Sequence, residues 1–77
     1  MIKTGTLLVM KDLYPKCLYE TARCDCRLTG PGAQVLPQEL VIFLNTGIRQ
    51  HSANVITTHG ICGWLFMDNL CDVDHYF

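Results

Sequence analysis

Five cysteines and three histidines are the most reactive side chains of this sequence. The cysteines are Cys17, Cys24, Cys26, Cys62 and Cys71. Because five is an odd number, disulfide bonds within one chain cannot pair all of them. The opening residues Met1–Gly5 lack the long apolar stretch of a secretory leader. We therefore expect a reducing cytoplasm, in which the thiols act as small hydrophobic side chains.

The pair Cys24 and Cys26 raises the question of a metal site. Cys17 and either His59 or His75 are the other potential ligands. Zinc sites usually contain two cysteines separated by two to four residues, because both sulfurs then reach one ion from a tight turn. The C-x-C spacing instead sends successive sulfurs to opposite sides of a strand. We expect no metal and no cofactor, and a Cys-based metal or redox module is the weakest functional alternative.

Nucleophilic catalysis requires a thiol or hydroxyl beside a base, together with an oxyanion hole. Cys62 and His59 are the cysteine and histidine closest together in the sequence. Their side chains need not converge across a tight turn. Asp72 and Asp74 share one face of a short predicted strand and are expected to be solvated charges. The sequence therefore predicts no catalytic site, and we do not expect an enzyme.

The aromatic residues are the candidates for a binding surface. In the predicted strand 61–65, Trp64 shares a face with Cys62 and lies on the outer wall if Leu65 points into the core. Outward aromatic rings can anchor a peptide or stack on a base. The competing interpretation, which we favour for Trp64, is that a large ring packs over a long loop. The candidate binding residues are Trp64, Tyr14, Tyr19 and Phe66.

The charges offer little to a nucleic acid. Six basic and seven acidic side chains leave a net charge of −1. The segment 11–34 contains four basic residues, Lys11, Lys16, Arg23 and Arg27, and three acidic residues, Asp12, Glu20 and Asp25. This small local excess is too weak for strong binding driven by counterion release. A nucleic-acid-associated barrel that uses loop 11–34 stays an alternative, ranked below binding to protein.

The 77 residues suit one domain, 1–77. Apolar residues make up 49% of the chain and charged residues 17%, which excludes an intrinsically disordered protein. No apolar run approaches the roughly 20 residues needed to cross a bilayer, so no membrane association is expected. A domain this small buries only about 60% of its unfolded surface. Its stability is therefore expected to be low, and at 49% apolar content some hydrophobic surface is expected to remain for a homo-oligomer or a larger partner.

Short apolar and β-branched runs separated by turn residues predict an all-β fold, a closed barrel or a sandwich. The expected strands are 5–10, 39–44, 52–58, 61–65 and 71–74. The continuous apolar run 39–44 predicts a strand covered on both faces. His59-Gly60 predicts a two-residue turn, Thr29–Gly32 a further turn, and Met67–Leu70 one helical turn. The rest of segment 11–34 is expected to be a long, partly stranded loop.

Two segments carry a resemblance to a known family. Gly5–Val9 has the form of an early G-x-L-V strand, and Gly60–Leu70 has the form G-x-x-G-W-x-x-x-x-x-L. These motifs resemble the SH3-like β-barrels, in particular the very small ones that tailed bacteriophages encode and that are abundant in marine viral sequence. The resemblance implies a small barrel of about five short strands. Loop 11–34 would follow the first strand, and one short helical turn would precede the last.

The resemblance also bears on function, although SH3-like barrels carry many unrelated activities. Peptide-binding relatives grip a polyproline helix between the long loop and the helical turn, with several aromatic residues and a proline. Met67-Asp68-Asn69 contains no proline. The acidic loop of the peptide-binding relatives is also weak here, because the tip of the long loop, around residues 20–25, carries only Glu20 and Asp25. Proline-rich recognition is therefore not expected. We expect a non-enzymatic binding or assembly module of phage origin, in the host cytoplasm, with a protein or a second copy as its partner.

Overall fold

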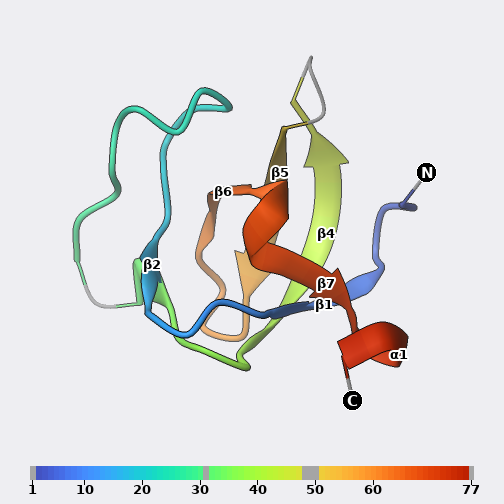
Figure 1. Cartoon of the computed structure of the whole chain (residues 1–77). Helices are drawn as coiled ribbons and strands as arrows, with labels where there is room; N and C mark the ends of the chain where they lie inside the picture. Colours follow the sequence, from blue (N-terminus) through green and yellow to red (C-terminus); the bar gives the residue numbers. More distant parts are fainter. Residues whose placement is uncertain (1, 31, 48–50, 77) are drawn as a thin grey trace.

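The computed structural model describes residues 2–30, 32–47 and 51–76. Short strands make up most of the regular secondary structure (Figure 1). The strands are β1 (Leu7–Met10), β2 (Lys16–Cys17), β3 (Gln34–Val35), β4 (Leu40–Thr46), β5 (Ser52–Thr57), β6 (Cys62–Phe66) and β7 (Leu70–Asp72). The helical segments are the 3₁₀ turn η1 (Met67–Asn69) and the single-turn helix α1 (Val73–Tyr76).

Five strands form one antiparallel sheet in the order β6-β5-β4-β1-β7, and β2 and β3 form a separate hairpin (Figure 1). The prediction of an all-β fold is confirmed, and each predicted strand begins and ends within two residues of an observed one. The sheet is open in the described part of the chain, because no ladder joins its edge strands β6 and β7.

One face of the sheet, together with the long loop, encloses the hydrophobic core. Alternate side chains of a strand point to opposite faces, so each strand contributes every second residue. The core residues are Leu8, Met10, Leu18, Val35, Val41, Phe43, Ala53, Val55, Leu65 and Leu70. Leu18 and Val35 come from the segment between β1 and β4, so this long loop is part of the core.

The β4 strand alternates between buried and exposed residues. Val41 and Phe43 are 1% and 2% exposed, whereas Ile42 between them is 42% exposed. The prediction of a strand covered on both faces is therefore wrong. A run of apolar side chains does not reveal which face has a layer above it. A register shift between Phe43 and Asn45 marks a bulge in β4.

In the hairpin between β5 and β6, the backbone pair Thr57 and Ile61 closes a loop of three residues, 58–60. Thr57 accepts a hydrogen bond from the Gly60 N–H and donates its own N–H to the Ile61 carbonyl, both at 2.9 Å. The Thr57 hydroxyl oxygen also accepts the N–H groups of His59 and Ile61. Gly60 has φ +81°, the left-handed conformation that ends such loops. The predicted two-residue turn is thus one residue too short.

The long loop between β1 and β4 is partly stranded, as predicted. Beyond the β2–β3 hairpin, an isolated bridge pairs Tyr19 with Arg27. In the predicted turn 29–32, Pro31 lies outside the described residues, while Gly30 and Gly32 both have positive φ.

The chain ends in two short helical segments with β7 between them. The predicted helical turn is confirmed as η1. The predicted strand 71–74 is wrong at its end, because Asp72 Oδ1 accepts the Asp74 N–H at 2.9 Å as α1 begins. Such local hydrogen bonds by Asp favour a turn over a strand. Among the described residues, neither helical segment has the length or apolar character to cross a membrane.

Gly63 allows the long loop to approach β6 closely. A Cβ atom at this position would lie 2.7 Å from Leu18 Cβ and 3.2 Å from Leu18 Cγ. Leu18 is fully buried, and its backbone is held by both arms of the loop. Its N–H donates to the Ala33 carbonyl at 2.8 Å, and its carbonyl accepts the Leu28 N–H at 2.9 Å. The missing side chain of Gly63 is therefore a packing requirement.

We predict that Gly63→Ala lowers the free energy of unfolding by about 1–3 kcal/mol, because the added methyl group would overpack a core contact that cannot easily relax. Thr58→Ala, an exposed substitution on the adjoining turn, is the control and should stay within about 0.5 kcal/mol of the unchanged protein. Urea unfolding followed by circular dichroism measures both. Equal midpoints for Gly63→Ala and the unchanged protein would contradict the proposed packing role of Gly63.

Candidate functional site

The candidate site lies where the long loop meets β6. The Tyr19 N–H donates to the Trp64 carbonyl at 3.0 Å, and the Trp64 N–H donates to the Tyr19 carbonyl at 2.8 Å. These two bonds occupy the edge of β6 that β5 does not use. An unpaired strand edge can recruit other chains. The loop therefore covers the middle of this edge with its own backbone.

Three of the four aromatic candidates come together here. Leu65 is fully buried while Trp64 is half-buried, so the prediction that these two residues occupy opposite faces of the strand is confirmed. The rings of Tyr19 and Phe66 meet edge to face, with centroids 6.2 Å apart and an interplanar angle of 68°. This geometry is favourable for an aromatic pair. We call Tyr19, Trp64 and Phe66 the aromatic cluster.

A second contact holds the tip of the loop near the aromatic cluster. The hydroxyl group of Ser52, which is only 3% exposed, donates to the Ala22 carbonyl at 2.7 Å. A Cβ atom on Gly47 would lie 2.6 Å from Ser52 Oγ, 3.2 Å from Ala22 Cβ and 3.8 Å from the ring of Trp64. The Trp64 ring thus faces outward on β6 and also lies close to the position where the loop tip is fastened.

A cleft of about 260 Å³ opens beside the aromatic cluster. The residues that line it are Tyr19, Glu20, Leu28, Asn54, Cys62, Gly63 and Trp64. Leu28 and Asn54 were not predicted as site residues, because nothing in the local sequence pattern shows that the loop folds over β5 and β6. Pockets that enclose small ligands usually have about 300–1,000 Å³. The cleft therefore suits one or two side chains of a partner better than a whole small molecule.

Another hollow, of about 360 Å³, lies at the end of β4. Its lining residues are Ile2, Thr4, Phe43, Leu44, Asn45, Thr46 and Met67. The Thr4 hydroxyl there donates to the Leu44 carbonyl at 2.7 Å. None of the lining residues is charged or nucleophilic beyond a hydroxyl group, so this hollow offers no catalytic chemistry.

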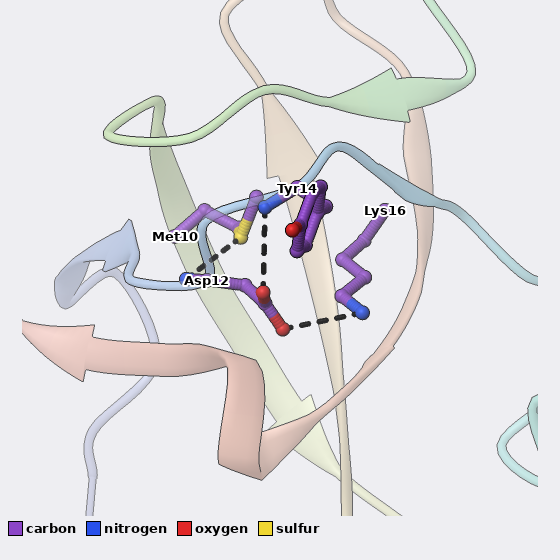
Figure 2. Close-up of polar contacts among 4 residues, drawn as sticks. All are labelled: Met10, Asp12, Tyr14 and Lys16. Atoms are coloured by element: carbon purple, nitrogen blue, oxygen red, sulfur yellow. Dashed lines mark hydrogen bonds and ion pairs between the residues drawn. The ribbon is translucent and has the colours of Figure 1, made fainter.

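Tyr14 belongs to a different contact (Figure 2). The Asp12 carboxylate accepts the Tyr14 N–H at 3.3 Å and pairs with Lys16 Nζ at 3.2 Å, and the Asp12 N–H donates to the Met10 sulfur at 3.3 Å. This turn leaves Tyr14 70% exposed. Within the described part of the chain, no ring contact joins Tyr14 to the aromatic cluster. The structure therefore does not unite all four predicted binding residues.

Two of the four basic residues of the loop have acidic partners. The hydrogen bond from Lys16 lowers the pKa of Asp12, and the Tyr14 N–H contributes to the same effect. The Thr21 hydroxyl donates to Asp25 Oδ1 at 2.6 Å and lowers the pKa of Asp25, whose other oxygen lies 3.6 Å from Arg23 Nε. These exposed pairs are weak, but they further reduce the positive field that a nucleic acid would meet.

The five cysteines are free thiols in different environments. Cys24 is buried, and this burial raises the pKa of its thiol, with the charge of Asp25 adding to the effect. Cys26 and Cys62 are exposed. No group of three or more His, Cys, Asp or Glu side chains among the described residues is close enough together to hold a metal ion. Likewise, no hydrogen bond joins His59 to Cys62 within the described segments.

These environments predict the order in which the thiols react. At neutral pH, iodoacetamide should alkylate Cys26 and Cys62 first and Cys24 much later, because the reactive form is an accessible thiolate and burial disfavours it. Peptide mass spectrometry after timed quenching measures the order. In guanidinium chloride the differences should largely disappear. Alkylation of Cys24 as fast as Cys26 in the folded protein would contradict the burial of Cys24.

Comparisons with protein-family models, curated proteins and solved structures found no match to this chain.

Proposed function

We propose that this chain is a small, non-enzymatic module of the SH3-like class that binds a protein or peptide through the aromatic cluster and its cleft. The observation that carries the proposal is the backbone pairing of Tyr19 with Trp64, which brings aromatic residues distant in sequence to one surface. Aromatic side chains are the commonest anchors of protein interfaces, because they bury much area at a small entropic cost.

The strand order supports the SH3-like part of the proposal. The last strand, β7, lies beside the first, β1, and η1 directly precedes it. The long loop lies between β1 and β4, and its residue Tyr19 occupies the free edge of β6, where a closing strand would pair in a complete barrel. Gly5–Val9 leads into β1, and Gly60–Leu70 spans β6 and η1. On these two motifs we propose a phage origin and a role in the host cytoplasm.

The composition of the cleft supports a protein ligand over a nucleic acid. Glu20 is the only ionisable side chain of the lining other than Tyr19 and Cys62, and it would repel a phosphate. Binding to single strands usually combines stacked aromatic rings with a positively charged groove, and such a groove would need several unpaired basic side chains. Asn54 and Glu20 can instead accept hydrogen bonds from a peptide backbone or from a basic side chain.

The proposal predicts that the protein selects ligands from a library of random short peptides. Trp64 is the only tryptophan of the chain, so its fluorescence reports on the site alone. Selected peptides, once synthesised, should change the emission of Trp64. Phe66→Ser should weaken their binding by about tenfold or more, because Phe66 is 44% exposed and pairs with Tyr19.

Leu13→Ser is the matched control, since Leu13 is 83% exposed and belongs neither to the aromatic cluster nor to the lining of the cleft. It should bind the same peptides as tightly as the unchanged protein. Equal losses in Leu13→Ser and Phe66→Ser, or no enrichment of peptides at all, would refute the proposed site. An oligothymidylate that changes the Trp64 emission at low salt, with an effect that fades steeply as salt rises, would favour the nucleic-acid alternative.

A further inference from the structure

The main sheet carries almost no charge. Strands β1, β4, β5 and β6 contain no Asp, Glu, Lys or Arg on either face. The single charged residue of the five strands is Asp72 in β7. It pairs with the core residue Leu8 and therefore lies on the inward face of the sheet, the face that carries the core. An antiparallel sheet with one face in water usually alternates apolar and polar side chains. The outward face of this sheet lacks the expected charged residues.

On that outward face, one row of paired residues that crosses four neighbouring strands is entirely apolar. Leu7 pairs with Ile42, Ile42 with Ile56, and Ile56 with Cys62. We call these four residues the outer row. Leu7 and Ile42 are 43% and 42% exposed, Cys62 is exposed and Ile56 is half-buried. Their flanking residues on the strands point into the core, so the outer row points away from it.

Both sides of the outer row are covered by other parts of the chain. Val9 in β1 also points to the outward face of the sheet, yet it is fully buried. The helix α1 packs against both β1 and β7, the two strands that pair at this position. On the opposite side, Ser52 is buried under the loop at Ala22. Figure 1 shows α1 at the β7 end of the sheet and the long loop on the β6 side. The outer row is the strip left uncovered between them.

We propose that the outer row is a homodimer interface, in which a second copy of this chain packs against it across a two-fold axis close to Ile42. An apolar strip is complementary to its own copy, because sheet faces pack on each other through interdigitating apolar side chains. A charged partner would find no opposite charge on these strands. The interface is distinct from the aromatic cluster, although Cys62 lies at the boundary of both.

The size of the strip sets the strength of the dimer. Strands lie about 4.8 Å apart, so four strands span roughly 14 Å between their axes. Such a strip, with its immediate surroundings, buries a few hundred Å² on each copy, less than the roughly 800 Å² of a standard stable interface. The dimer should therefore be weak and should form only at high protein concentration. Its stability should not fall with added salt, since no ion pairs hold it.

Sedimentation equilibrium over a wide range of protein concentrations tests this proposal. The unchanged protein should pass from monomer to dimer, and Ile42→Lys should raise the dissociation constant about tenfold or more, because two like charges would meet at the axis. Leu13→Lys, the control with a charge on an exposed residue outside the sheet, should dimerise normally. Circular dichroism and thermal unfolding establish that Ile42→Lys stays folded.

A second measurement needs no substitution. In a mixture of isotope-labelled and unlabelled protein, filtered NOE spectra should show contacts between the methyl groups of Ile42 or Ile56 and those of the other copy. A monomer at every accessible concentration, or a dimer without these NOE contacts, would overturn the proposal. Phe66→Ser should still dimerise, so its failure to bind peptides and the loss of the dimer are separable. A dimer lost in Phe66→Ser would place the interface at the aromatic cluster instead.

Discussion

The contact between Leu18-Tyr19 and Gly63-Trp64 is the constraint on which the rest of this structure depends. Leu18 fills the core at a position where Gly63 has no side chain, and Tyr19 then pairs with Trp64 through two backbone hydrogen bonds. Core packing and edge pairing are thus achieved by adjacent residues of one segment. Without this contact the long loop would leave the core open on one side, and the β6 edge would be unpaired.

The same contact explains how so small a chain can present two different surfaces. Docking of the loop at β6 assembles the aromatic cluster and its cleft, and the tether from Ser52 to Ala22 holds the loop tip over one end of the sheet. At the other end, α1 packs against β1 and β7. The outer row lies between these two covers. A domain of this size has too little chain to cover both faces of its sheet, so one apolar strip is left over.

The sequence was informative where local pattern decides the structure. Short apolar and β-branched runs located all five main strands, and Asp68-Asn69 marked η1. Local pattern did not predict the structure where contacts between residues distant in the sequence determine it. The exposure of Ile42 depends on which face has a cover, and the meeting of Tyr19 with Trp64 depends on the path of the loop. Tyr14 and Tyr19 are alike as tyrosines in one loop, yet only the backbone pairing at Tyr19 brings its ring to β6.

Amide hydrogen exchange at Tyr19 and Trp64 tests the docking of the loop most directly. Both N–H groups donate across the bridge that joins the loop to β6, and each residue gives a separate signal in a two-dimensional NMR spectrum. If the loop is an integral part of the fold, both amides should exchange as slowly as that of Val55 in the core strand β5, since all three then open only with the whole domain. Exchange of the Tyr19 amide at the rate of an unprotected loop, while Val55 stays protected, would contradict the account.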